Sequence, residues 1–399
     1  MQEETSELIN CKNVLSCVER DLQNPSRADI AKHLGMSRTT ASQSINKLIE
    51  MGIVCELEKA SNGGRGRPGL PLELDEKHWY ALGGFFDDAD WYFSVVTLKG
   101  TIIDKKHIPL KDLTVDSFIE ALFEGVHFFL QKYGKKLLFA LGLGCPGVID
   151  RSTGTIVKAV DLGWTDIPLK RIIQEKFGLP VYILNRYRTS GLASFLYGKG
   201  AGFQDVIFLG VGTGFGTCIF LRGKPMLSTN IHTGGIGHIT VDPNGPYCVC
   251  GRKGCLFPVG SSTALINQTT AALQQGGSTS SLSNKPLNVE TIMTAANKGD
   301  ELAQKCVRSV ADPLCIAIGN LINIINPQRI ILGGPMGYYG RYYCSYIEQK
   351  VIETYHTPEL SIVQTSMDNF GNAIGAASLV LENKLFLLST SSFEERAES

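Results

Sequence analysis

The chain has 399 residues, which is enough for two or three packed units. Hydrophobic residues make up 43% and charged residues 19%, so the composition indicates globular cores and excludes a largely disordered chain. Lys and Arg together number 38, as do Asp and Glu, which excludes a strongly basic protein. Any surface that binds nucleic acid must therefore be local.

The sequence does not show the patterns expected of a membrane helix or of a signal peptide. No uninterrupted apolar run reaches the roughly 18 residues that a membrane helix needs. The N-terminus, MQEETSELIN, is acidic and polar, unlike a signal peptide. We therefore expect a cytoplasmic protein with no membrane contact. Eleven cysteines are present, and in a reducing compartment they need not form disulfides. Eight of them are scattered and predicted to be small core residues.

The first zone, residues 1–60, has helical patterns and no long strand. Ser26 is a suitable N-cap for a helix over 27–34. Gly35 follows and can supply the tight turn to a second helix. The three-residue spacing predicts that one buried face of the first helix is formed by Ala28, Ala31 and Leu34.

A second helix is predicted from the N-cap Ser37 to about Glu50, and residues 52–57 follow as a wing strand. Its apolar stripe comprises Ala41, Ile45, Leu48 and Ile49. A short helix, a glycine turn and a polar-faced second helix are typical of a helix-turn-helix that enters the major groove. The predicted DNA-binding residues here are Arg38, Thr39, Thr40, Ser42, Gln43, Asn46 and Lys47. The alternative is a small helical bundle that binds nothing.

Residues 61–72, SNGGRGRPGLPL, form a predicted linker rich in Gly, Pro and Arg. Arg65 and Arg67 can lie in the narrow minor groove, where crowded phosphates attract arginine. The alternative is a flexible linker with incidental charges. Between residues 24 and 72 there are seven Lys or Arg and four Asp or Glu, a local balance of +3. This local charge favours DNA binding.

The rest of the chain, residues 73–388, alternates β-rich runs with helical patterns. Such alternation predicts an α/β unit in which helices cover strands. Residues 389–399 are polar and are predicted to form a disordered tail.

Four segments of this zone carry a family resemblance: 143–155 (LGCPGVIDRSTGT), 210–217 (GVGTGFGT), 234–255 with its CxCGxxGC run, and 323–334 (NIINPQRIILGG). Together they resemble the ROK family (repressor, open reading frame, kinase). The resemblance covers nearly the whole chain, including the helix-turn-helix and RGRP linker of the repressor branch. It implies an N-terminal winged helix-turn-helix followed by a two-lobed sensor domain of the actin/hexokinase (ribonuclease H-like) fold, with the two lobes around a cleft.

The CxCGxxGC run places Cys248, Cys250 and Cys255 within eight residues. The resemblance supplies His238 as a fourth ligand. One imidazole and three thiolates fill a tetrahedral Zn²⁺ shell with no open position, so the predicted cofactor is structural zinc. The alternatives are a disulfide or three unrelated thiols.

At several positions the chain departs from the pattern of active ROK kinases. The stretch matching the phosphate loop, residues 85–89, is bulky and acidic and would repel phosphate. The position of the catalytic base is Arg186, and a guanidinium cannot accept a sugar proton. Gly235 and Phe257 replace two glutamates, and Asp161 replaces an asparagine. These losses predict that the chain is not an enzyme.

We therefore expect a repressor of carbohydrate uptake or metabolism genes that binds operator DNA as a homodimer or tetramer. A small molecule in the cleft, a sugar or sugar phosphate, would change the spacing of the two DNA-binding heads. The candidate effector-binding residues are Cys145, Asp161, Asn185, Arg186, Arg188 and His238. Arg186 and Arg188 favour an anionic effector, unless both pair internally with acids such as Asp161. The alternatives are a ROK-type sugar kinase with an appended DNA-binding head, and a sensor whose head binds a protein.

Overall fold

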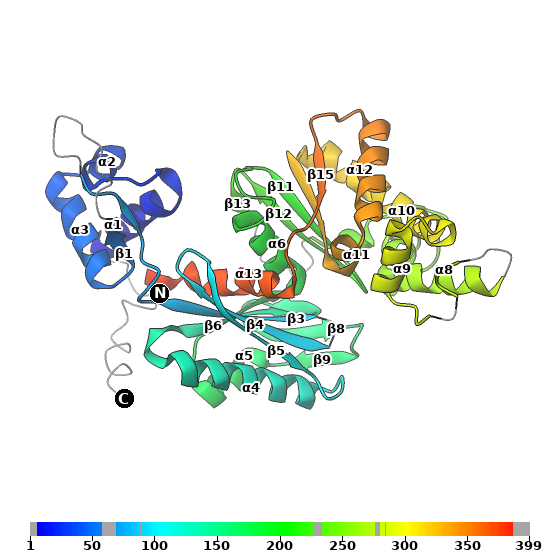
Figure 1. Ribbon diagram of the computed structural model, residues 1–399, viewed down its shortest axis with the longest axis horizontal. Coiled ribbons are helices and arrows are strands. Elements are labelled where there is room, and N and C mark those ends of the chain that lie inside the picture. Colours follow the sequence, from blue (N-terminus) through cyan, green and yellow to red (C-terminus); the bar gives the residue numbers. More distant parts are fainter. Residues whose placement is uncertain are drawn as a thin grey trace.

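The computed structural model describes residues 6–57, 69–87, 89–226, 234–275, 280–283 and 285–385. A small N-terminal head packs beside two α/β lobes, and a C-terminal helix runs between the head and the junction of the lobes (Figure 1).

The head contains three α-helices and a two-stranded sheet. Its elements are α1 (Ser6–Ser16), the π-helical turn η1 (Cys17–Asp21), α2 (Arg27–His33), α3 (Arg38–Glu50), β1 (Val54–Glu56) and β2 (Leu72–Leu74). The predicted N-caps are confirmed, since the side chains of Ser26 and Ser37 accept hydrogen bonds from backbone N–H groups of α2 and α3. Gly35 has φ +62°, as the tight turn requires. The head therefore has the predicted helix-turn-helix.

The predicted buried face of α2 is partly wrong, because Ala28 is exposed. Ile30 and Ala31 are buried instead, and Leu34 is partly buried. With 3.6 residues per turn, positions 30, 31 and 34 share one face, whereas Ala28 lies off it.

The predicted linker also needs correction at its C-terminal end. Strand β2 pairs antiparallel with β1, with Val54 opposite Leu74, so residues 72–74 belong to the head. Pro71 bridges to Ser26 in the same way. Residues 72–74 therefore extend the head, and the first strand of the sensor domain is β3, which begins at Tyr80. The RGRP run lies outside the described residues.

The first lobe is a five-stranded sheet in the order β10-β6-β3-β4-β5. The strands are β3 (Tyr80–Asp87), β4 (Asp90–Thr97), β5 (Ile102–Pro109), β6 (Leu137–Cys145) and β10 (Val181–Asn185). Helices α4 (Val115–Tyr133) and α5 (Leu169–Phe177) cover one face (Figure 1). A small antiparallel sheet of β7 (Val148–Asp150), β8 (Thr155–Ala159) and β9 (Trp164–Ile167) adjoins them. Aromatic side chains of α4 and β4 fill the core between sheet and helices.

The second lobe is a five-stranded sheet in the order β13-β12-β11-β14-β15. The strands are β11 (Val206–Val211), β12 (Phe215–Leu221), β13 (Lys224–Pro225), β14 (Arg329–Gly333) and β15 (Ser361–Gln364). Helix α6 (Arg186–Leu196) packs on one face. A group of helices shares a hydrophobic core with the other face. The group comprises η3 (Ile236–His238), α7 (Phe257–Gly260), α8 (Ser262–Gln274), α9 (Val289–Asn297), α10 (Glu301–Ile325), α11 (Gly334–Tyr339) and α12 (Arg341–Tyr355). The predicted two-lobed α/β architecture is confirmed.

Helix α13 (Asn369–Leu381) joins the parts of the molecule. It lies on the second face of the first lobe's sheet at very short range: a Cβ added at Gly142 would lie 1.9 Å from the carbonyl oxygen of Ala376. One hydrophobic cluster includes Ala377 and Leu381 of α13 together with Ile45 and Leu48 of α3. The head is therefore packed onto the sensor domain rather than joined to it only by a linker.

Helix α10 is the one helix in the described part of the chain that is long and apolar enough to cross a membrane by length and composition. Half of its most apolar window is buried inside the protein, as expected for a core helix. Charged residues such as Lys305 and Arg308 interrupt α10, so the sequence shows no continuous apolar run there.

Of the eight scattered cysteines, seven are buried as predicted, and Cys55 is partly buried.

Candidate functional site

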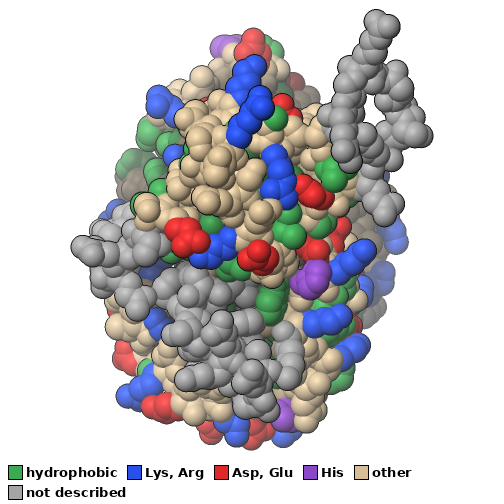
Figure 2. All heavy atoms as spheres, turned by 90° about the vertical axis from the view of Figure 1, so that its left-hand side faces the viewer, with side chains coloured by type: hydrophobic (Ala, Val, Ile, Leu, Met, Phe, Trp, Pro, Cys, Tyr) green, Lys and Arg blue, Asp and Glu red, His purple; other side chains and the backbone are tan. Residues whose placement is uncertain are grey.

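The polar face of α3 is accessible on the head. Arg38, Thr39, Gln43 and Asn46 are exposed, whereas Thr40, Ser42 and Lys47 are partly buried. The opposite face is buried through Ala41, Ile45 and Leu48, as predicted, and Ile49 is partly buried. On the side of the molecule that carries the head, basic side chains are interspersed with acidic ones rather than gathered in one patch (Figure 2). The head can therefore present α3, but its described charge is modest.

Several of the predicted DNA-binding residues make contacts within the head. Lys47 Nζ lies 2.7 Å from Glu7 Oε1 of α1. The hydroxyls of Thr40 and the N-cap Ser37 lie 2.8 Å apart. Asn46 accepts a hydrogen bond from Arg27. These contacts hold the three side chains in the head, and each side chain keeps further hydrogen-bonding capacity for DNA.

Arg27 is a residue that the sequence reasoning missed. Its Nε donates to Glu56 of β1 at 2.7 Å, and its Nη1 donates to Asn46 of α3 at 2.7 Å. One guanidinium thus joins the start of α2, the middle of α3 and the wing strand. No sequence signal marked it, because Arg27 and Glu56 are 29 residues apart and meet only in the folded head.

The four predicted metal ligands come together in the second lobe. One ligand atom from each of His238, Cys248, Cys250 and Cys255 lies within 4.8 Å of all the others. The sulfurs of Cys250 and Cys255 are 3.7 Å apart, and Cys248 Sγ is 3.5 Å from His238 Nδ1. Around a tetrahedral ion with Zn–S of about 2.3 Å and Zn–N of about 2.05 Å, these separations would be about 3.8 Å and 3.6 Å. The four ligands therefore fit a metal ion.

The local backbone explains how three thiols converge within eight residues. Gly251 and Gly254 have φ values of +86° and +75°, which other residues rarely adopt. A Cβ at Gly254 would lie 1.7 Å from the carbonyl oxygen of Asp242. Hydrogen bonds from the backbone and side chain of Arg252 lower the pKa of the Cys250 thiol to about 7. At Cys250 this favours the thiolate form that binds metals.

At the cleft, Arg186 lies between two carboxylates. Its Nη1 is 3.1 Å from Asp87 Oδ1 on β3, and its Nη2 is 3.2 Å from Asp161 Oδ2. Thr213, in the β11–β12 turn of the second lobe, donates to the same oxygen of Asp161 at 2.9 Å. The side chains of Arg186 and Asp87 are only 10% and 9% exposed, so water screens their ion pair little. We call Asp87, Arg186, Asp161 and Thr213 the interlobe network.

The interlobe network supports one of the sequence alternatives, since Arg186 pairs internally with Asp161. It also places Asp87, from the altered phosphate loop, against Arg186, at the position of the kinase base. Asp88 of that loop lies outside the described residues. The Arg186 guanidinium cannot itself accept a proton, and it engages both neighbouring carboxylates.

The remaining candidate effector residues do not gather around one cavity. Cys145 is fully buried in the core of the first lobe. Asn185 caps α6, since its side-chain oxygen accepts from the N–H of Tyr187 and its amide donates to the carbonyl of Gly147. His238 belongs to the metal cluster. The structure therefore does not bring the six candidate effector residues together around one cavity of the described residues, and their role in effector binding stays a prediction.

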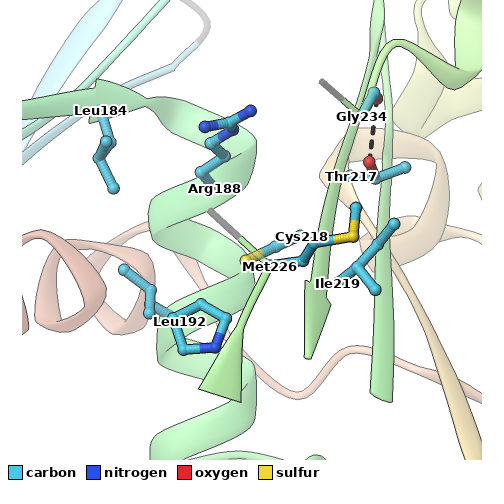
Figure 3. Close-up of a pocket in the computed structure, with 9 residues that line it drawn as sticks. Leu184, Arg188, Leu192, Thr217, Cys218, Ile219, Met226 and Gly234 are labelled. Carbon is cyan, nitrogen blue, oxygen red and sulfur yellow. Dashed lines mark hydrogen bonds between the residues drawn. The ribbon is translucent and has the colours of Figure 1, made fainter. Parts of the chain in front are cut away.

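Arg188 lines a separate small pocket between α6 and β12, where Thr217 and Cys218 also lie (Figure 3). Burial lowers the pKa of Arg188 and raises that of Cys218 to about 12. The pocket has a volume of about 20 Å³, which is room for about one water molecule. It is too small for a sugar.

Comparison with known proteins agrees with this architecture. A sequence model of the ROK family matches residues 89–383, and one of winged helix-turn-helix DNA-binding domains matches residues 15–54. The DNA-binding transcriptional dual regulator NagC of Escherichia coli K12 is 28% identical over 364 residues, which cover 89% of this chain and 88% of NagC. The xylose repressor of Caldicellulosiruptor bescii is 26% identical over 371 residues, 90% of this chain and 92% of its own.

Solved structures share this fold over most or all of the chain. A ROK family transcriptional regulator described as a homologue of E. coli Mlc aligns with a TM-score of 0.80 at 24% identity, over 98% of both chains. A ROK family glucokinase from Streptomyces griseus aligns with a TM-score of 0.66 at 23% identity and covers 75% of this chain. With a family match over most of its length and a winged head at its N-terminus, the chain belongs to the repressor branch of the ROK family.

Proposed function

We propose that this protein represses carbohydrate uptake or metabolism genes by binding operator DNA through α3 and the RGRP segment, under the control of a sugar effector. The observation that carries the proposal is the exposed polar face of α3 on a head packed against α13. Repressors related to it along nearly their whole length are named for xylose and N-acetylglucosamine. A homodimer would place two heads on a two-fold symmetric operator.

The contacts of Arg186 bear on the kind of effector. Asp87 and Asp161 both lie against its guanidinium, which leaves little positive charge for a phosphate in this part of the cleft. An uncharged sugar is therefore favoured over a sugar phosphate.

We also infer that the chain has no sugar kinase activity, because the interlobe network occupies the positions of the phosphate loop and base. The competing hypothesis is an active kinase with an appended head, which the likeness of the lobes to glucokinase favours. An assay of ADP release with ATP and a broad sugar panel separates the two. Sugar-dependent turnover would establish the kinase, whereas its absence beside intact DNA binding supports the repressor.

The metal cluster is proposed to hold structural Zn²⁺. Four protein ligands complete a tetrahedral shell and leave no position for a reacting water. Zinc would supply a crosslink between η3 and the 248–255 loop, whose following residue, Leu256, is buried in the core of the second lobe. Its proposed role is thus to fix this loop on the lobe.

The first test concerns α3, the helix proposed to enter the major groove. Gln43→Ala should lower the affinity for the DNA upstream of the protein's own gene about tenfold, since a side-chain amide that pairs with a base edge contributes roughly 1–3 kcal/mol. The measurement is an electrophoretic mobility shift titration. Gln174→Ala, at an exposed position of α5, is the matched control and should leave the affinity unchanged. Equal behaviour of the two variants would mean that α3 does not read the operator.

A second test concerns the basic wing segment. Arg65→Ala combined with Arg67→Ala should weaken DNA binding and reduce the slope of log K against log salt by about 2. Each phosphate contact releases about one counterion from the DNA when the protein binds, and the double variant lacks two such contacts. The control pair is Arg171→Ala with Lys176→Ala, both exposed on α5. A slope that is the same for both double variants would exclude the wing from the DNA interface.

A further inference from the structure

The guanidinium of Arg27 joins three elements of the head, and one of its partners is a predicted DNA-binding residue. Its Nη1 donates to Asn46 Oδ1 of α3 at 2.7 Å and approaches the carbonyl oxygen of Ser42, one turn earlier, at 3.5 Å. Its Nε donates to Glu56 of β1 at 2.7 Å. Because the N–H groups of a guanidinium lie in one rigid plane, a side chain that meets these partners together has little freedom to turn. Arg27 therefore holds Asn46 from one fixed direction.

The backbone at Arg27 is itself held in place. Ser26 and Asp29 form a capping box, in which the Asp29 carboxylate accepts the N–H of Ser26 at 2.9 Å and the Ser26 hydroxyl accepts the N–H of Asp29 at 3.3 Å. Ser26 also bridges to Pro71, next to β2. The side chain that reaches Asn46 thus starts from a fixed point at the beginning of α2.

These contacts determine which end of the Asn46 amide faces solvent. A guanidinium has N–H donors and no acceptor, so the atom of Asn46 that meets Arg27 must be the oxygen. Turning the amide over would set its own N–H groups against those donors. The amide nitrogen makes no hydrogen bond with the described residues, and Asn46 is exposed. Asn46 therefore presents N–H donors to a molecule that approaches α3.

Asn46 lies on the face of α3 that is proposed to enter the major groove. Thr39, Gln43 and Asn46 are spaced by four and three residues, so they share one exposed stripe. At 1.5 Å per residue this stripe is about 10 Å long, which is close to the roughly 12 Å width of the major groove. The three side chains can therefore reach base edges in the same groove.

We propose that Arg27 determines which base Asn46 reads: the amide, held with its nitrogen outward, donates to a base acceptor, and guanine is preferred; this rests on the DNA-binding function proposed above. Guanine offers two neighbouring acceptors in the major groove, N7 and O6, whereas cytosine offers only the N4 donor. Adenine is read by an amide that turns both its oxygen and its nitrogen to the base, and here the oxygen is turned to Arg27. Arg27 is thus a positioning residue, which acts on the base through Asn46.

The exposure of the Arg27–Glu56 pair predicts where its loss is felt. The two side chains are 31% and 30% exposed, so solvent screens the pair and its contribution to stability is small. Removal of Arg27 should leave the head folded and free the Asn46 amide to turn over, so that it presents either oxygen or nitrogen. The expected consequence is a broader choice of bases at one operator position, with DNA binding retained.

The test measures base preference on the DNA upstream of the protein's own gene. Each base pair of the segment that the full-length protein protects is replaced in turn by the other three, and affinities are measured by mobility shift. The parent should prefer guanine about tenfold at one position of each half-site. Arg27→Ala should reduce this preference to about twofold by admitting adenine, with the preferences at other positions unchanged. Lys32→Ala is the matched control, because it removes an exposed cation from the same helix and should keep every preference.

Asn46→Asp provides a second readout that does not remove Arg27. Aspartate keeps an oxygen for Arg27, so the positioning contact survives, but it has no N–H for the base. A carboxylate accepts from cytosine N4, so the preferred base at the same position should change from guanine to cytosine. Thermal unfolding midpoints of all three variants should stay close to that of the parent.

The possible results separate the role of Arg27 from the proposed function. A parent that binds no upstream DNA contradicts both. If the parent binds and Arg27→Ala keeps the same guanine preference, the role of Arg27 is wrong while the repressor function stands. Equal broadening in Lys32→Ala, an unchanged preferred base in Asn46→Asp, or adenine as the preferred base of the parent at the position that Asn46 reads would likewise exclude it.

Discussion

Cys255→Ser is expected to abolish stoichiometric metal binding and to destabilise the second lobe. The metal binds the folded cluster and not the unfolded chain, so it stabilises folding by about 4 kcal/mol when free zinc is a thousandfold above Kd. Loss of this contribution should lower the thermal midpoint by about 8–16 °C for a unit of this size. Metal content by atomic emission and differential scanning calorimetry measure the two effects.

The control for this variant is Cys306→Ser. Cys306 is 6% exposed, lies in the core of the same lobe and is not among the four clustered ligands. Its replacement places the same hydroxyl in an apolar environment without touching the metal. If both serine variants retain the metal, or if both lose equal stability, the cluster has no structural role.

The metal cluster was the part of the site that sequence reasoning predicted best, for a physical reason. Three of the ligands lie within eight residues, and the glycines between them allow the tight backbone that brings the sulfurs together. A single short segment therefore supplies three of the four ligands of the site. The helix-turn-helix was predicted for a similar reason, because the N-caps Ser26 and Ser37 act over three residues.

The parts that sequence reasoning missed depend on contacts between distant segments. Asp87 and Arg186 are 99 positions apart, and their pairing requires the first lobe's sheet to bring β3 and β10 to the same side of the cleft. The contacts of Arg27 likewise join α2, α3 and β1. Alternating hydrophobicity places each strand in a sheet but does not specify which side chains meet across it.

The pairing of β1 with β2 was also missed, and it moved the domain boundary. Composition identified residues 61–72 as a linker because they are rich in Gly and Pro. Strand β2 is only three residues long, so its pattern is too short to recognise. The contact between α13 and the head could not be predicted either, since small residues on α13 suit packing against many surfaces.

Arg186→Ala is expected to destabilise the junction of the lobes by about 3 kcal/mol. The substitution removes the cation that faces both Asp87 and Asp161, and breaking a buried pair in this way costs about 3–5 kcal/mol. We use the lower end because the Asp161 side chain is 28% exposed and water can stabilise it. The measurement is the midpoint of urea unfolding, followed by circular dichroism.

A double substitution decides whether the stability lost in Arg186→Ala is lost because carboxylates are left unpaired or because side-chain packing is removed. Arg186→Met combined with Asp87→Leu replaces the buried pair by apolar groups, so it should recover most of the stability that Arg186→Ala loses. Arg171→Ala is the control for a surface arginine, since its side chain is 71% exposed, and its stability should stay within about 0.5 kcal/mol of the parent. Equal stability of the Arg186→Ala variant and the parent would show that the interlobe network does not hold the lobes together. An Arg186→Asp variant tests the proposed absence of kinase activity, because it places a carboxylate at the position that the base occupies in ROK kinases. It should still release no ADP, because Asp87 remains in the altered phosphate loop and would repel the phosphates of ATP.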